Sequence, residues 1–162
     1  KIQNRPNAKL VRKKAWGGLP FDPQYYCHKY KSAGVRYGIT SCIQTGEIVD
    51  CAGPFPCGNW PDINILKKYV VPLLAEGEMI EADRGYRHER CRNPEDFFTK
   101  SEKKAKKRVA ARHETINGRL AQWRSLCWAF RHNHHEHKYF FYTAAIVDNL
   151  VYQKYGSTYC SY

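Results

Sequence analysis

The chain has 162 residues, of which 27 are Lys or Arg and 15 are Asp or Glu, and 14% are aromatic. This length suits one compact domain with its own core, and the aromatic content excludes a chain that is disordered throughout. No apolar stretch is long enough to cross a bilayer and no secretory signal is present, so we expect neither a membrane protein nor a secreted one. The positive charge predicts a polyanionic partner, with nucleic acid first, an anionic surface second and a merely basic protein as the alternative.

The seven cysteines are scattered and include no CxxC pair, which argues against a structural zinc module. We interpret them as reduced intracellular thiols that mostly fill small core positions.

The first half of the chain predicts a β-hairpin that follows a basic, loop-rich lead-in over residues 1–34. Strands are expected over residues 35–43 and 48–52, and Thr45 and Gly46 form the short turn between them. Apolar residues at helical spacing then predict a helix with Asp62 as its N-cap.

The second half predicts a short strand over residues 78–83, an Arg-rich loop over 84–98 and a long helix from about Ser101. A last helix over residues 139–152 is apolar on most sides, and we expect it to be buried. The order of elements favours a mixed α/β domain. A 4-3-4-3-4 spacing marks the core-facing side of the long helix, formed by Val109, His113, Ile116, Leu120, Trp123 and Cys127.

Glu114 lies roughly opposite that apolar stripe, at about 100° per residue. A solvated helix glutamate normally has a basic residue three or four positions away, and this one has none. Its neighbours three and four positions away are Ala110, Ala111, Asn117 and Gly118; Ala121 follows it by seven positions, and Lys103, Lys106 and Lys107 precede it. Space around a carboxylate with cations nearby suits a metal and phosphate site.

Asp83 ends the predicted strand, where α/β proteins commonly place ligands. Arg84, Arg87, His88, Arg90 and Arg92 follow it, so a simple ion pair is the alternative interpretation. One acid at a strand end and one on a helix face could meet at a shared divalent ion.

Several ordered blocks resemble the nuclease domain of PIF/Harbinger-like DDE transposases. The blocks lie at residues 42–49, 52–62, 81–86, 111–120 and 130–132, and the resemblance covers about residues 20–150. It implies an RNase H-like mixed sheet flanked by helices, forming a single domain over residues 1–162.

The resemblance also implies two Asp and one Glu that hold two Mg²⁺ or Mn²⁺ ions, with Asp83 as the second acid and Glu114 as the third. Two such ions about 4 Å apart can activate a nucleophile and stabilise the leaving oxygen at phosphorus. The first acid is expected upstream of Lys1, so that most of the first strand is lacking here; neither Asp22 nor Asp50 is a candidate for it. The family often has a basic residue seven positions after the glutamate, and Ala121 stands there.

DNA contact is expected from cations near the two acids, at Arg84, Arg87, Lys103, Lys107, Arg112 and Arg119. The alternative for the basic run at residues 100–112 is a solvated helix face. Four histidines, His132, His134, His135 and His137, predict a polar loop that faces DNA more than they predict a zinc site.

Three functions stay open from these observations. The first is a metal-dependent DNA endonuclease or strand-transfer domain of a nuclear transposase, cutting phosphodiester bonds. The second is a catalytically lapsed derivative that binds DNA or protein, and the third is a basic partner-binding domain. A separate DNA-binding protein and a homodimer are further partners that the sequence leaves open.

Overall fold

The computed structural model describes residues 8–9, 22–127, 130 and 132–156. Most of the lead-in, Lys1, Arg131 and Cys160 lie outside these ranges, as do the expectations made for them. Three short elements occupy the described part of the lead-in, namely β1 (Ala8–Lys9), a 3-10 turn (Pro23–Tyr25) and β2 (Tyr26–Cys27).

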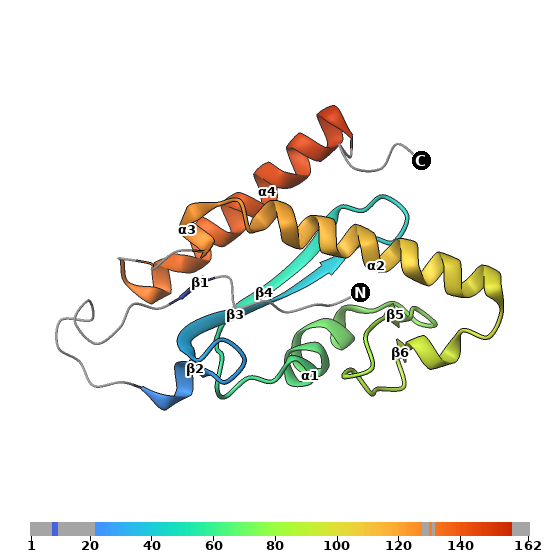
Figure 1. Ribbon diagram of the computed structural model, residues 1–162, viewed down its shortest axis with the longest axis horizontal. Helices are drawn as coiled ribbons and strands as arrows, with labels where there is room; N and C mark the ends of the chain where they lie inside the picture. The colour runs from blue at the N-terminus through green and yellow to red at the C-terminus, as the bar shows by residue number, and fades with distance from the viewer. Residues whose placement is uncertain (1–7, 10–21, 128–129, 131, 157–162) are drawn as a thin grey trace.

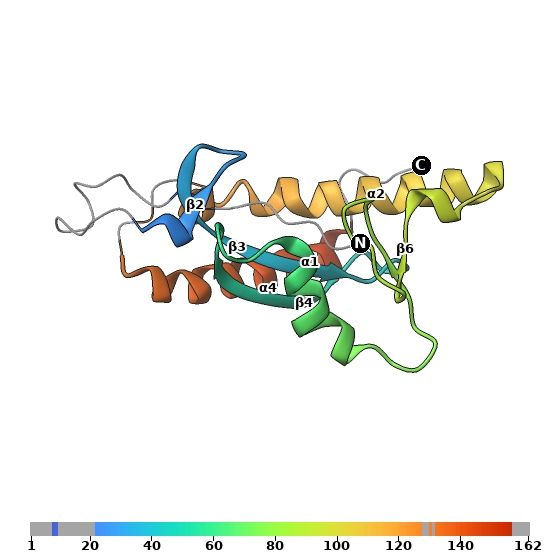
Figure 2. The ribbon, with the colours of Figure 1, turned by 90° about the horizontal axis from the view of Figure 1, so that it is seen from below.

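Two long antiparallel strands, β3 (Ser32–Ser41) and β4 (Ile48–Pro56), form the predicted hairpin. On the other edge of β3, β1 and β2 pair with its first residues. The hairpin lies between two layers: α2 (Lys100–Leu120), α3 (Arg124–Cys127) and α4 (His137–Tyr155) cover one face, and α1 (Asp62–Ile65) covers the other (Figure 1). Figure 2 shows α1 in front of the hairpin when the molecule is seen from below.

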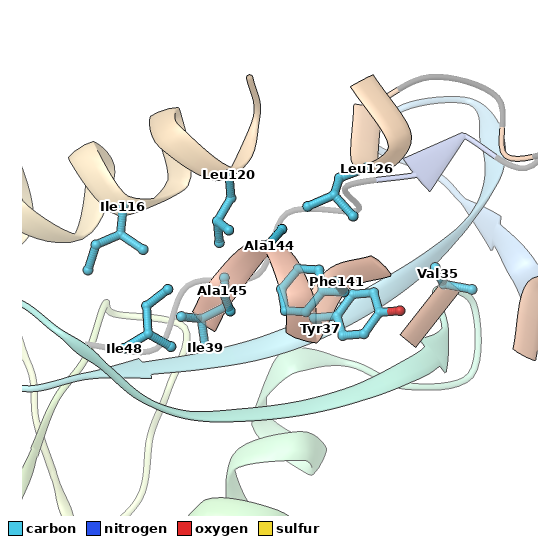
Figure 3. Close-up of a cluster of buried hydrophobic side chains, with 10 residues drawn as sticks. All are labelled: Val35, Tyr37, Ile39, Ile48, Ile116, Leu120, Leu126, Phe141, Ala144 and Ala145. Atoms are coloured by element: carbon cyan, nitrogen blue, oxygen red, sulfur yellow. The ribbon is translucent and has the colours of Figure 1, made fainter. Parts of the chain in front are cut away.

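The main core forms where the hairpin meets the three helices (Figure 3). Val35, Tyr37 and Ile39 alternate along β3 and point to this face, as the two-residue period of a strand requires. Phe141 of α4 stacks on Tyr37 with 3.7 Å between ring centroids, and both side chains are fully buried. Ile116 of α2 closes the cluster from the other helix.

The strand β4 runs four residues beyond the predicted end at residue 52. Its pairing with β3 is irregular between Arg36 and Gly38, where Gly53 has φ 137°. A Cβ on Gly53 would lie 2.8 Å from the Arg36 carbonyl oxygen, so only glycine fits this position. The extended end of β4 packs Phe55 against Ile65 of α1 on the far face of the hairpin.

Asp62 is the first residue of α1 and not its cap, so the predicted N-cap is wrong. The cap position is Pro61, and no side chain bonds to the free backbone N–H groups there. The Asp62 carboxylate instead accepts a hydrogen bond from Arg36 of β3, which also donates to the Trp60 carbonyl at 2.8 Å. A partly buried guanidinium needs an anionic partner, so the Asp62 carboxylate pairs with Arg36 and does not accept from the backbone N–H groups at the start of the helix.

After α1 the helix continues as a π-helical turn (Leu66–Val70) and a 3-10 turn (Val71–Leu73). Next come β5 (Ile80–Glu81) and β6 (Cys91–Arg92), which pair in parallel. The expected strand over 78–83 is therefore shorter, and β6 lies inside what was predicted to be loop. A second core cluster beneath this pair contains Leu66, Val70, Ile80, Ala82, Tyr86 and Cys91. The predicted mixed α/β class is confirmed.

The long helix α2 begins one residue before the predicted start. Thr99 caps it and forms a reciprocal capping box with Glu102. The expected apolar stripe is interrupted, because α2 ends at Leu120, Trp123 is exposed in the following turn and Cys127 belongs to α3.

The last helix, α4, is longer than predicted and is buried on one side only. Phe141, Ala144 and Ala145 pack in the core, whereas Tyr139, Ile146 and Leu150 are each more than half exposed. The expectation of a helix buried on most sides is therefore wrong. No helix in the described ranges combines the length and apolarity that a membrane span requires.

Candidate functional site

The first half of α2 is attached to the strand pair β5–β6 by a buried lysine. The Lys106 ammonium lies 3.2 Å from the Ala82 carbonyl oxygen, 3.3 Å from the Arg92 carbonyl oxygen and 3.5 Å from the Glu81 carboxylate. Ala82 directly precedes Asp83, so this contact places α2 beside the strand end that carries the predicted acid. Lys106 therefore stabilises the packing of α2 against β5–β6, whereas the neighbouring lysines face solvent.

The second half of α2 is attached to the hairpin. The Arg112 guanidinium donates to the carbonyl oxygens of Ile43 at 2.6 Å and Gln44 at 3.0 Å, near the hairpin turn. Ile116 and Leu120 then enter the main core. A single helix therefore spans both sheets, as Figure 1 shows.

Glu114 lies within the second half of α2, two residues after Arg112 and two before Ile116. It follows Lys106 by eight residues, which is about 12 Å along the helix axis. Its side chain is half-buried. On one side of it along the helix surface lie the buried residues His113 and Asn117, and on the other side lie the exposed residues Ala111 and Gly118. The space where a Gly118 side chain would stand is open. A group from solvent can approach the carboxylate from that side.

Exposed cations lie on the same side of α2 as Glu114. Helical geometry puts Lys103, Lys107, Glu114 and Gly118 within an arc of about 60°. Lys103 and Lys107 are exposed, as are Lys100, Lys104 and Arg108 around them. Glu114 therefore lies on a basic face of α2, as predicted. Lys106 does not belong to this face, because it is buried.

Asp83 begins a tight turn directly after β5. The Tyr86 backbone N–H donates to the Asp83 carbonyl oxygen at 3.0 Å, and the Asp83 side chain is half-buried. Burial raises the pKa of the Tyr86 phenol, and the negative charges of Asp62 and Asp83 raise it further. The buried Tyr86 phenol is therefore close enough to both carboxylates to be affected by their charge.

The sequence did not single out Arg36 or Tyr86 as parts of this region, and it placed Lys106 only among the cations that precede Glu114. Arg36 carries a detectable signal, because an arginine within an apolar strand needs a buried or partly buried partner. Lys106 has no such signal, since it lies within a run of lysines and only the docking of α2 distinguishes it.

The other two acids considered earlier lie elsewhere, in the hairpin and at the start of a 3-10 turn. Asp50 pairs with Thr40 across the hairpin, and burial raises the pKa of its carboxyl group. Asp22 accepts from the Gln24 N–H at the start of a 3-10 turn. In the part of the chain that the structure describes, no group of three or more His, Cys, Asp or Glu could hold a metal ion.

Two of the predicted DNA-binding arginines are engaged inside the fold. Arg112 holds the hairpin turn, and Arg119 pairs with buried Asp148 of α4 at 3.1 Å. The remaining predicted contacts are exposed. Arg84 is 78% exposed although it pairs with Glu95 at 2.8 Å, and Arg87 is exposed in the same loop.

The four clustered histidines have different surroundings. His137 is fully buried, and its Nδ1 is hydrogen-bonded to the Tyr37 hydroxyl at 2.7 Å, so its assignment to a polar loop is wrong. Burial lowers the pKa of His137 to about 4. His132 and His135 are exposed, and the side chain of His134 lies outside the described part.

No family model, curated protein or solved structure matches this chain.

Proposed function

We propose that this protein is an RNase H-like nuclease domain of a transposase or a transposon-derived protein, with Asp83 and Glu114 as two of its acidic ligands. DNA binds along the exposed cations of α2. The observation that carries this proposal is the position of Glu114: it follows exposed Lys103 and Lys107 on a helix that is anchored beside Asp83 through Lys106.

The arrangement of elements supports the RNase H-like part of the proposal. A four-stranded antiparallel sheet, a separate parallel strand pair and one helix that crosses both supply strands of both orientations and flanking helices, which such a fold combines in one sheet. The family resemblance assigns Asp83 and Glu114 to a DDE site on these elements.

Electrostatics supports the DNA-binding part. The chain carries a formal net charge of +12, and the basic face of α2 concentrates cations on one exposed side. Each lysine that neutralises a phosphate releases condensed counterions, which makes binding strong at low salt and weak at high salt. The side chains of Lys103 and Lys107 are long enough to reach a backbone that passes over Glu114.

The metal part of the proposal is incomplete within the described residues. Asp83 and Glu114 are hard oxygen ligands that suit Mg²⁺ or Mn²⁺, but they do not belong to a described group of three ligands. This observation favours a second candidate function, a derivative of the same fold that binds DNA without cutting it.

DNA binding is tested by fluorescence anisotropy with a duplex at several salt concentrations. Replacing both Lys103 and Lys107 with Ala should weaken binding and reduce the slope of log affinity against log salt by roughly 2. The control replaces Lys29 and Lys67, two exposed lysines elsewhere, and changes the net charge equally. Equal losses in both double variants would show that only net charge matters and would overturn the proposed DNA path.

Cleavage is tested with the full-length protein on supercoiled plasmid with Mg²⁺ or Mn²⁺, because the proposed site needs its first acid as well as Asp83 and Glu114. Nicking should be lost in Asp83→Asn and in Glu114→Gln and retained in Glu76→Gln, which changes an exposed glutamate. Full activity in either of the first two variants would sink the nuclease assignment. Salt-sensitive DNA binding without nicking by the unaltered protein would favour the second candidate, and no DNA binding at low salt would overturn both.

A further inference from the structure

Helix α4 exposes a continuous apolar face. Its opposite side packs Phe141, Ala144 and Ala145 into the main core. The exposed face is formed by Tyr139 (62% exposed), Phe140 (41%), Ile146 (61%), Leu150 (58%) and Val151 (47%). At about 100° per residue these five side chains fall within an arc of about 140°, so they form one surface.

This surface is as large as the largest apolar patches of typical monomers, which are often functional. Together the five side chains expose on the order of 500 Å² of mainly apolar area, and contiguous patches of this size commonly mark interaction sites. If two copies met through it, the total buried area would reach about 1,000 Å², the lower limit for a specific interface. In Figure 1 the C-terminal part of α4 forms the upper edge of the molecule.

The charge distribution points to a second copy of this chain as the partner. Copies with a net charge of +12 repel each other, so they can associate only through a surface that lacks cations. Between Lys138 and Lys154 the only charged residue is Asp148, and it is buried against Arg119. The exposed side of α4 is therefore neutral along almost its whole length.

We propose that two copies pair through α4 in an antiparallel, two-fold arrangement. Such pairing with its midpoint at residue 145 brings exposed Glu136, at the start of one helix, to exposed Lys154, near the end of the other. The two helix dipoles then oppose each other favourably. The same register sets Tyr139 against Val151, Phe140 against Leu150 and Thr143 against Val147. The charged pair and the apolar contacts thus favour the same register. This pairing does not depend on the proposed nuclease function.

The first experiment is sedimentation velocity of the full chain over a wide range of concentrations. We expect a monomer–dimer equilibrium and at least a roughly 100-fold weaker dimer in Leu150→Glu, because the charge would be buried in the apolar contact, against Phe140 of the second copy. Leu73→Glu is the matched control, since Leu73 is 67% exposed in a different element, and it should leave the dimer unchanged. Circular dichroism establishes that both variants are folded, and Ile146→Glu provides a second test of the same face.

The second experiment tests the register by exchanging charges. Lys154→Glu should weaken the dimer about tenfold, because two attractive pairs become repulsive, and Glu136→Lys should do the same. The double variant should restore the affinity. Additive loss in the double variant would overturn the antiparallel register.

Three results would overturn pairing through α4. They are a protein that stays monomeric at every concentration, a dimer that survives Leu150→Glu and Ile146→Glu, and a monomer that binds anionic vesicles through these same residues. The last would assign the face to a membrane surface.

Discussion

Helices α2 and α4 are similar in length, at 21 and 19 residues, and both contribute to the main core, yet they present opposite chemistry to solvent. The outer side of α2 carries lysines, and the outer side of α4 carries aromatic and aliphatic side chains. Their inner sides are alike because both must fill the same space against the hairpin.

The solvent-facing sides of the two helices, and not their core-facing sides, are therefore the places where binding partners are expected. Packing against a common core constrains the inner side of each helix, whereas the outer side is free to match whatever it meets. A row of exposed cations suits an anionic chain, and an exposed apolar face suits another apolar surface. Each helix would then have one partner of its own, DNA for α2 and a second copy of the chain for α4. Substitutions of inner and outer side chains on the same helix should therefore have different effects.

The largest effect is expected from two adjacent phenylalanines of α4. Phe141→Ala should lower the free energy of unfolding by about 3–5 kcal/mol, because it removes a fully buried ring stacked on Tyr37. Phe140→Ala, at a ring that is 41% exposed, should cost less than about 1 kcal/mol. Urea unfolding at low protein concentration measures both, and equal losses would contradict the two-sided description of α4.

A somewhat smaller effect concerns pH. The pKa of His137 is lowered to about 4 from an ordinary value of 6.5 by burial, so the folded protein favours the neutral ring. This contribution to stability is complete above pH 6.5 and is lost as pH falls toward 4, by up to about 3 kcal/mol. We therefore expect the advantage of the unaltered protein over His137→Gln to shrink over that range.

Unfolding in urea at a series of pH values measures this difference. The raised pKa values of Asp50 and Asp148 work in the opposite direction, because protonation at low pH favours the folded state there, but both groups are present in the two proteins compared. A difference that does not change with pH would contradict the buried, neutral state of His137.

The smallest effect on stability is expected at two adjacent lysines of α2. One of them is buried and structural, and the other is exposed and proposed to bind DNA. Lys106→Met should cost about 2 kcal/mol, because two carbonyl groups and the Glu81 carboxylate lose their cation. Lys107→Met should leave stability within about 0.5 kcal/mol and weaken DNA binding. The reverse pattern, with DNA binding lost in Lys106→Met alone, would break the assignment of the inner and outer sides of α2.

The hairpin and the two long helices were predictable because each is long and has a clear period of its own. The β5–β6 pair was harder to predict, since each strand has two residues and β6 lies among arginines. The same limit applies to individual side chains. Glu114 could be singled out from its small neighbours, but Asp62 was misassigned because Arg36, its partner, is distant along the chain.

Composition and residues within a few positions of one another were enough to predict the α/β class, the positive charge, the hairpin, the long basic helix and the small residues around Glu114. Three outcomes depend instead on contacts between distant parts of the chain: Lys106 is buried against the Ala82 carbonyl, Arg119 pairs with Asp148, and α4 leaves an apolar face in solvent. Those outcomes depend on which elements pack together, because tertiary packing and not residue type decides whether a side chain is buried.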